Sequence, residues 1–324
     1  MYRYLLLLLL VAAGCTPRVE PIPLSIVRFD HDVWALKDSV SQAALDSIRL
    51  RYGAFGALYF EEVIQLGSQK DSLFPERIRL FVDHPVVVGA FTQAQAVFSD
   101  LATEESTMGE AFAHYAKLFP DEPLPDFYAC VTGFNHSVVT AEGIVAIGLD
   151  KYLGSEEPLY GQLGLADYQR RVMRREYMVP DVLRAIGYAR FAKNDSSENL
   201  ISDMIYEGRN LYFVQQLLPK SPDTLLFGFT RAQLDWCHAA KSDIWRMLIE
   251  QELLFSADRM TRIKLIQPAP YTSYFSTESP GRAAVWLGYE IVRAYMKENP
   301  AVSMPLLMAE RNYQKILNGS RFKP

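Results

Sequence analysis

Residues 200–218 carry the sequence LISDMIYEGRNLYFVQQLL, in which large apolar side chains recur at intervals of three and four. This spacing predicts a helix with one apolar face. The side chains on that face are Leu200, Met204, Leu211, Val214 and Leu218. Glu207 falls on the same face, so we expect its carboxylate to point toward the core. Because burying an unpaired carboxylate costs several kcal/mol or forces it to take up a proton, Glu207 needs a partner.

The partner that we predict for Glu207 is Arg282, with Arg174 and Arg175 as alternatives. The neighbouring Gly208 would let a second backbone come close. Two interpretations of the Glu207–Arg282 pair stay open. It is either a working or remnant active-site carboxylate with its counter-ion, or a structural buried ion pair.

Outside residues 200–218, the spacing of apolar and polar residues predicts an α+β fold that is mostly helical, with a small β-sheet in mid-chain. Strand-like runs occupy residues 127–131, 137–140 and 143–149. Residues 24–36 also alternate like a strand. The chain after Gly154 has a helical pattern throughout, and no convincing linker divides it, so we predict a single domain over residues 24–324.

Capping residues locate the helices. Ser39 to Gln42 have the form of a capping box, and Thr230 with Gln233 has the same form. Residues 167–191 predict one long helical segment, in which Pro180 allows a break. Asp195 with Glu198 predicts the cap of the next helix. Ser279 before Pro280 predicts the start of a buried helix over residues 281–297.

Composition excludes two classes of protein. The 324 residues include 33 Lys and Arg against 38 Asp and Glu, a net charge of −5. Nucleic acid is therefore not expected as a partner, because phosphate binding needs a surplus of basic side chains. No apolar run reaches the ~18–20 residues that a membrane-spanning helix needs.

The first residues predict export. Arg3 precedes an apolar run over residues 4–13, and Ala12-Ala13-Gly14 precede Cys15. A charged start, an apolar centre and small residues before the cut are typical of a signal peptide, here residues 1–14. Small residues directly before a cysteine resemble the lipobox of bacterial lipoproteins, in which that cysteine is lipidated. Residues 15–23, with three prolines, are expected to form a lipidated tether that anchors the protein to a membrane.

Searches for catalytic and metal-binding motifs find little. The five histidines show no HExxH or other helical pair, so we expect no metal site and no cofactor. There is no GxSxG motif for a nucleophile, and no catalytic residue is assigned. Cys130 lies in a strand-like run and Cys237 in a helical one, which favours two buried free thiols over a disulfide.

Several motifs together resemble the GldB family of gliding-motility lipoproteins. They are the lipobox, Arg28-Phe29-Asp30, Tyr152-Leu153-Gly154, Tyr177 to Val182, Glu207-Gly208-Arg209, Asp235-Trp236-Cys237, Ile244-Trp245-Arg246, Glu278 to Arg282 and Trp286-Leu287-Gly288. The likeness covers the whole mature chain. It implies an outer-membrane lipoprotein, associated with the machinery of gliding and type IX secretion and with its envelope proteins as partners. Because no acidic cluster directly follows Cys15, a periplasm-facing position is favoured.

A more remote likeness is to a predicted zinc-metallopeptidase family with a zincin-like body. In that family one helix carries HExxH and the next offers a glutamate, which Glu207 matches. The corresponding helix here, residues 168–191, has no histidine. Its one pair of oxygen-bearing side chains at the four-residue spacing of the two HExxH histidines is Tyr177 and Asp181. The resemblance therefore implies a degenerate scaffold with Tyr177 and Asp181 as cleft residues.

The hypothesis from sequence is a lipid-anchored, non-catalytic protein that binds envelope components. Two alternatives stay open. One is an envelope hydrolase that uses unconventional residues such as Glu207, Asp181 and Tyr177. The other is a lipoprotein that binds glycans or peptides in the same cleft.

Overall fold

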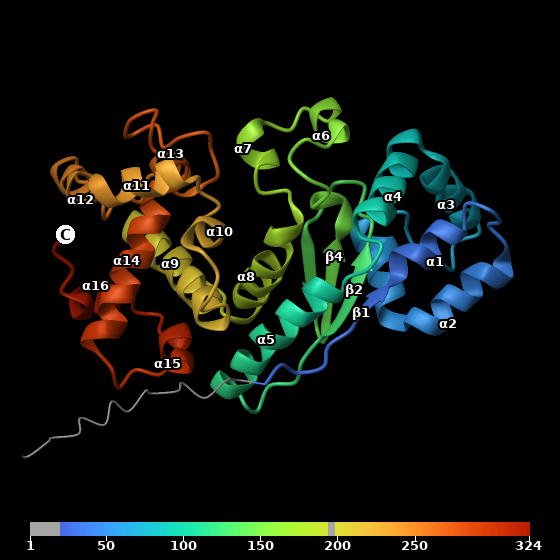
Figure 1. The fold of residues 1–324 in the computed structure, drawn as a ribbon, viewed down its shortest axis with the longest axis horizontal. Helices are drawn as coiled ribbons and strands as arrows, with labels where there is room; N and C mark the ends of the chain where they lie inside the picture. Colours follow the sequence, from blue (N-terminus) through green and yellow to red (C-terminus); the bar gives the residue numbers. More distant parts are fainter. Residues whose placement is uncertain (1–19, 194–197) are drawn as a thin grey trace, which may run out of the picture.

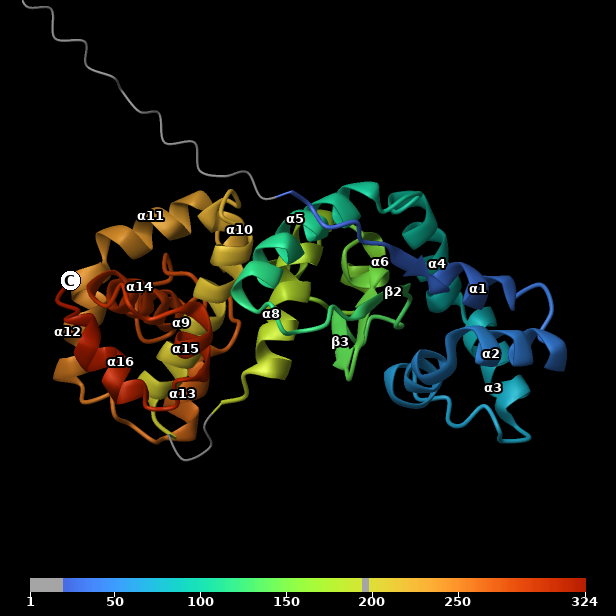
Figure 2. The ribbon, with the colours of Figure 1, turned by 90° about the horizontal axis from the view of Figure 1, so that it is seen from below.

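A computed structural model describes residues 20–193 and 198–324. The residues predicted as a signal peptide, Cys15 and the predicted cap residue Asp195 lie outside these residues. Two lobes lie side by side along the long axis (Figures 1 and 2). The first, which we call the sheet lobe, contains β1 (Ile26–Arg28), α1 (Phe29–Ala35), α2 (Gln42–Leu58), α3 (Phe74–Asp83), α4 (Pro85–Val97), α5 (Ala102–Leu118), β2 (Asp126–Cys130), β3 (Val138–Ala141), β4 (Ile144–Gly148), α6 (Pro158–Gln162), α7 (Asp167–Arg170) and α8 (Met178–Arg190).

The second, the helical lobe, contains α9 (Leu200–Leu217), α10 (Asp223–Phe227), α11 (Arg231–Ala239), α12 (Lys241–Glu250), α13 (Arg259–Ile266), α14 (Ala283–Glu298), α15 (Met304–Ala309) and α16 (Tyr313–Ser320). The mostly helical α+β architecture with a small sheet is as predicted. One connected core of buried apolar side chains runs from Ile26 to Ile316 through both lobes. None of the helices within the described residues has the length and hydrophobicity that a bilayer span requires.

The sheet has the strand order β1-β2-β4-β3. Strands β1, β2 and β4 are parallel, and β3 pairs antiparallel with β4. The three strands predicted in mid-chain are present, each with bounds shifted by one residue or more. The hairpin between β3 and β4 turns at Gly143, whose φ of +67° lies in the left-handed region that glycine tolerates best.

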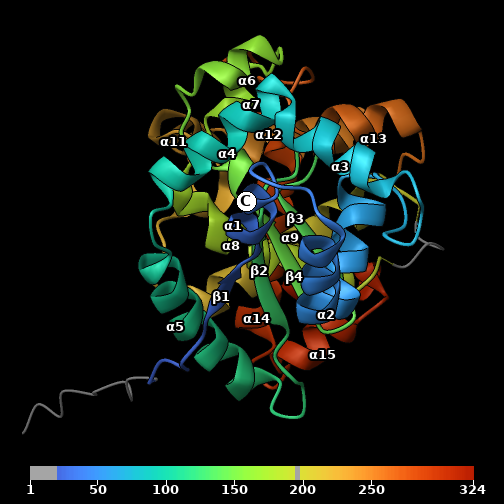
Figure 3. The same cartoon turned by 90° about the vertical axis from the view of Figure 1, so that its right-hand side faces the viewer.

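Alternation along β2 distributes its side chains between two layers of helices (Figure 3). Tyr128 stacks on Phe55 of α2, with ring centroids 4.0 Å apart. Phe127 points the other way and meets Phe112 of α5 edge-on at 5.1 Å. The sheet therefore has α2 against one face and α5 against the other.

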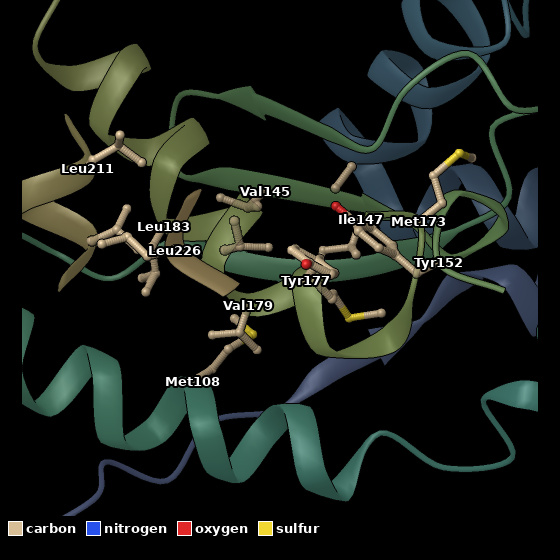
Figure 4. Packing of buried hydrophobic residues seen from close by; sticks show 14 of the residues in the cluster. Met108, Val145, Ile147, Tyr152, Met173, Tyr177, Val179, Leu183, Leu211 and Leu226 are labelled. Carbon is tan, nitrogen blue, oxygen red and sulfur yellow. The ribbon is translucent and has the colours of Figure 1, made fainter. Parts of the chain in front are cut away.

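Helix α8 packs on the same side as α5 and fills the space between the sheet and the helical lobe. Figure 4 shows Val145 and Ile147 of β4 facing Val179 and Leu183 of α8. All four side chains are almost completely buried. Helix α8 is thus the element through which the sheet contacts the second lobe, and this position sets up the site described below.

Several predicted elements differ from the structure. The cap of α2 is Ser41, whose side chain accepts from the N–H of Ala44, and not Ser39. Residues 24–36 form a three-residue strand followed by α1, because Phe29, Val33 and Leu36 are buried at helical rather than alternating spacing. The predicted helix over residues 167–191 is divided between α7 and α8. Between them, a β-bridge to Leu153 holds Arg174 in an extended conformation, and Arg175–Tyr177 form a short 3₁₀ helix before α8.

Helices α9 and α14 cross at two glycines. A Cβ atom on Gly208 would lie 2.3 Å from the carbonyl carbon of Gly288, and one on Gly288 would lie 1.9 Å from the carbonyl oxygen of Met204. The close backbone approach predicted at Gly208 is therefore present. The predicted apolar stripe does not describe α9, because this helix is buried on nearly every side.

Helix α14 does not begin at Ser279-Pro280 as predicted. It begins at Ala283, whose backbone N–H donates to Oγ1 of Thr272 at 3.1 Å. Ser279 is fully buried, and its hydroxyl bonds to the loop before the helix, including the backbone oxygen of Ser276 at 2.6 Å. The cap comes from a residue eleven positions earlier, which local sequence patterns do not reveal.

The segment predicted as a tether is partly docked. The N–H of Ile22 donates to the carbonyl of Gly109 in α5 at 3.1 Å. A Cβ atom on Gly109 would lie 2.6 Å from the carbonyl oxygen of Ile22. Residues 20–23 are therefore fixed to the body, because glycine at position 109 lets the two backbones meet.

The contact between Ile22 and Gly109 can be tested by mutation. We expect Gly109→Ala to displace residues 20–24 from α5 and to destabilise the protein by about 1–2 kcal/mol, because an overpacked contact must open. Limited proteolysis should then cut near Ile22 faster than in the wild type. Equal cleavage rates in the two proteins would contradict this role of Gly109.

Candidate functional site

Polar side chains from both lobes meet where α8 faces α9 and the start of α14. We call this group the inter-lobe cluster. Its members are Tyr152, Asp181, Arg184, Tyr188, Glu207 and Arg282.

Glu207 is at the centre of one half of the cluster. Its Oε2 atom accepts a hydrogen bond from Arg282 Nη2 at 2.6 Å and another from the Tyr188 hydroxyl at 2.6 Å. The Glu207 side chain is 17% exposed and that of Arg282 is 21% exposed. The contact that the sequence predicts between Glu207 and Arg282 is therefore present, and it is mostly buried. Sequence analysis expected Glu207 to face the core, but it lies on the less buried side of α9.

The backbone holds Arg282 in place. Arg282 precedes α14 with a φ of +64°, which is unusual for a residue with a side chain. Its Nε donates to the carbonyl of Ile266 at 3.0 Å. The guanidinium thus links the end of α13 to Glu207, and this pair of contacts accounts for an arginine at a position that backbone strain disfavours.

Asp181 is at the centre of the other half. Its Oδ2 accepts from the Tyr152 hydroxyl at 3.1 Å, and its Oδ1 lies 3.5 Å from Arg184 Nη1. Although 26% of the side chain is exposed, burial raises the pKa of Asp181 above its ordinary value. The positive charges of Arg184 and Arg282 act against that rise. Arg282 therefore connects the two halves electrostatically.

The remaining predicted residues lie elsewhere. Tyr177 is buried and has the Arg174 guanidinium 5.3 Å from its ring. No hydrogen bond joins it to Asp181 or Glu207 in the described part of the chain. The alternative partners of Glu207 are engaged with other acids, Arg174 with Glu176 at 3.1 Å and Arg175 with Glu104 at 2.5 Å.

Tyr152, Arg184 and Tyr188 were not predicted as site residues. A signal for two of them was present, since Asp181, Arg184 and Tyr188 are spaced by three and four residues and so share one face of α8. Burial raises the pKa of Tyr188, and the Glu207 carboxylate raises it further. The Tyr188 phenol therefore keeps its proton and acts as a hydrogen-bond donor.

A charged groove of about 620 Å³ begins beside Glu207 and follows α9 and α13. Asp203 in this groove pairs with Lys193 and, at 2.6 Å, with Arg262 Nε. Within the described residues, no protein group is in hydrogen-bonding contact with the Oε1 atom of Glu207. The arrangement can therefore tie α8, α9 and α14 together and still offer one carboxylate oxygen to a ligand.

The side chains that could bind a metal or react as thiols are few and buried or scattered. Among residues 20–193 and 198–324, no group of three or more His, Cys, Asp or Glu side chains is placed to hold a metal ion. Cys130 and Cys237 are both free and buried, as predicted. Burial raises the pKa of Cys237 to about 12 and that of Cys130 well above its ordinary value. Both thiols therefore stay protonated and unreactive at neutral pH.

The direction of the Asp181 shift predicts a pH dependence. A carboxyl whose pKa is raised by folding binds more protons in the folded state, so its contribution to stability falls as pH rises above the ordinary value of 3.8. Asp181→Asn mimics the protonated form and lacks this titration. We expect the free energy of unfolding of the wild type, relative to Asp181→Asn, to fall as pH rises through the raised pKa. Urea denaturation at a series of pH values measures this, and a constant or rising difference would contradict it.

The fold and the cluster define a class of protein: a two-lobed α+β body with a mixed four-stranded sheet, whose lobes meet at a carboxylate that accepts from Tyr188 of one lobe and from Arg282 of the other. The model of the family described as gliding motility protein GldB matches residues 15–324, and the chain belongs to that family. No curated protein and no solved structure gives a significant match. Family membership associates the chain with gliding motility.

Proposed function

We propose that this protein is a non-catalytic lipoprotein of the outer membrane that acts by binding envelope partners. Cys15 carries the lipid, and the body faces the periplasm. The partners belong to the gliding and type IX secretion machinery. Membership of the GldB family and the lipobox-like residues before Cys15 support this proposal.

The observation that carries the non-catalytic part is the state of Glu207. Its Oε2 is bonded both to Arg282 and to Tyr188, which belong to different lobes. A general base must reach the proton that it takes, whereas Oε2 of Glu207 already accepts two hydrogen bonds that tie α8 to the start of α14. The geometry favours a lock between lobes, on a scaffold that we take to be a degenerate relative of metallopeptidases.

The anchoring part is supported by the docked segment. Ile22 is fixed to α5 only seven positions after Cys15. Seven extended residues span at most about 25 Å. A lipid on Cys15 would therefore hold the folded body close to the bilayer, where it can meet other membrane proteins.

The test is co-purification from crosslinked cell envelopes. Tagged wild-type protein should retrieve components of the secretion and gliding machinery, identified by mass spectrometry. Cys15→Ser, which cannot be lipidated, should be lost from the membrane fraction and retrieve much less. Equal membrane retention of both proteins would refute the anchor. An anchored protein that retrieves no component of that machinery would refute the partner assignment.

The groove beside Glu207 favours a second candidate function, which is the binding of a glycan or peptide. It is lined by charged side chains of both signs and reaches the free oxygen of Glu207. Glu207→Gln keeps the size of the side chain and removes its charge. If ligand binding operates, this variant should lose affinity for envelope fragments while its fold is retained, and unchanged affinity would exclude Glu207 from such a site.

A further inference from the structure

A basic groove of about 710 Å³ lies at the C-terminal end of the helical lobe. Its walls are α12, α14 and the chain that follows α16. The basic side chains that line it are Lys241, Arg293, Lys297, Arg321 and Lys323. The acidic side chains are Glu290 and Glu298. Counting side chains, the groove carries five positive and two negative charges, although the whole chain has a net charge of −5.

The two acids do not neutralise the groove. Glu290 is 3% exposed, and one of its oxygens accepts from both Lys241 at 2.7 Å and Arg293 at 2.8 Å. Glu298 lies 3.6 Å from Arg321. Lys297 and Lys323 have no ion-pair partner within the described residues. An excess of positive charge therefore faces the solvent, and in a concave surface its potential is focused.

An apolar groove of about 800 Å³ lies directly beside the basic one. The apolar side chains that line it are Trp245, Leu248, Ile249, Leu254, Phe255, Leu317 and Phe322. Two of these are unusually exposed for their size, Ile249 at 50% and Phe255 at 59%. A concentration of exposed apolar side chains next to cations is typical of an interaction surface.

The two grooves share one wall, formed by Arg321, Phe322 and Lys323. Arg321 ends α16 with a φ of +49°. The ring of Phe322, the next residue, contacts side chains of both the basic and the apolar groove. Lys241 Nζ lies 5.0 Å from its centre on the basic side, and Trp245 meets it edge-on at 5.4 Å on the apolar side. A ligand that fills both grooves therefore needs an anionic group and an apolar chain next to each other, separated by no more than the width of the Phe322 side chain.

We propose that this double groove is a contact site for a bilayer surface rich in anionic phospholipid. Headgroup phosphates would occupy the basic groove, and Ile249 and Phe255 would enter the acyl region. Trp245 and Phe322 lie between the two grooves. In this arrangement their rings would lie at the membrane–water interface, where aromatic side chains are favoured.

Two observations favour lipid over an acidic peptide. The rim cations are long and exposed, since the side chain of Arg321 is 80% exposed and that of Arg293 is 54% exposed. A fluid headgroup layer leaves such side chains their rotamer freedom, whereas a fixed partner does not. The walls are mainly helices whose backbone groups bond internally, so an extended peptide would find few backbone partners there. The proposed anchor at Cys15 would add a third reason, because it would keep the whole protein at a membrane.

The test uses the mature chain with Cys15→Ser, which keeps every described residue and carries no lipid. Co-sedimentation should show binding to phosphatidylglycerol vesicles, weaker at high salt, and little binding to phosphatidylcholine vesicles. Neutralising one lysine near a membrane costs about a five-fold loss in partitioning. Lys297→Gln with Lys323→Gln should therefore bind about 30-fold less. Ile249→Ser with Phe255→Ser should also bind less.

Matched controls lie in the sheet lobe, far along the chain from the two grooves. Lys70→Gln with Lys117→Gln removes two exposed lysines, and Leu50→Ser with Leu80→Ser removes two exposed leucines. These variants should bind as the wild type does. Brominated phosphatidylglycerol should quench tryptophan fluorescence, and Trp245→Phe should remove most of that quenching.

Equal binding to both kinds of vesicle, or equal losses in the groove and control variants, would overturn the proposal. So would binding of an acidic amphipathic peptide in the groove together with no binding of vesicles. Because the assayed chain carries no lipid at residue 15, failure of the proposed anchor in cells would leave this result unchanged.

Discussion

Gly208→Ala is expected to lower the free energy of unfolding by about 3 kcal/mol or more, because the added methyl group would overlap backbone and not a flexible side chain. Its Cβ would lie 2.3–2.5 Å from three backbone atoms of α14. Gly288→Ala should have a similar or larger effect, with a Cβ 1.9 Å from the Met204 carbonyl oxygen. Either change forces apart the two central helices of the second lobe. Thermal or urea unfolding of the purified variants measures the loss.

Gly161→Ala is the matched control. Gly161 lies in helix α6, and the nearest atom to its added Cβ would be the end of the Arg170 side chain at 3.8 Å. Alanine favours the helix there, so the variant should be as stable as the wild type or slightly more stable. If Gly208→Ala were as stable as Gly161→Ala, the helices would not cross as closely as described.

Glu207→Ala is expected to destabilise the protein by about 3 kcal/mol, because it leaves the Arg282 guanidinium mostly buried without its counter-ion. Glu207→Gln keeps an acceptor for Arg282 and Tyr188, so its cost should be nearer 1 kcal/mol. In a double-mutant cycle, Glu207→Ala and Arg282→Ala together should cost less than the sum of the two, since each alone strands the other group.

The control for this pair is an exposed one. Arg231 and Asp235 form an ion pair on the surface of α11, with side chains 80% and 57% exposed. Asp235→Ala should cost at most about 0.5 kcal/mol, because solvent screens such pairs. An effect of Glu207→Ala no larger than that of Asp235→Ala would mean that the inter-lobe cluster gains no stability from the Glu207–Arg282 pair.

Local patterns predicted the parts of this fold that depend on near neighbours. The strands of the mid-chain sheet, the buried helix α14 and the Thr230 cap of α11 follow from alternation, uniform hydrophobicity and a capping box. The apolar pattern of residues 200–218 also predicted an arginine partner for Glu207, because an acid among buried residues requires a cation.

The parts that could not be predicted depend on distant residues. The start of α14 is fixed by Thr272 through a loop that folds back. The break between α7 and α8 depends on the pairing of Arg174 with Leu153. The four-residue spacing of Phe29 and Val33 fits both the alternation of a strand and the period of a helix. Contact with the rest of the core selects the helix. Tyr188 and Tyr152 entered the cluster unpredicted because a tyrosine in an apolar segment usually indicates core packing.

The central claim is that the inter-lobe cluster holds the lobes together and carries out no reaction. Incubating isolated envelope material with purified wild-type protein or with Glu207→Gln, followed by mass spectrometry of released peptides and glycans, tests it most directly. The account predicts that both proteins release the same products as buffer alone. Fragments released by the wild type and absent with a folded Glu207→Gln variant would contradict it.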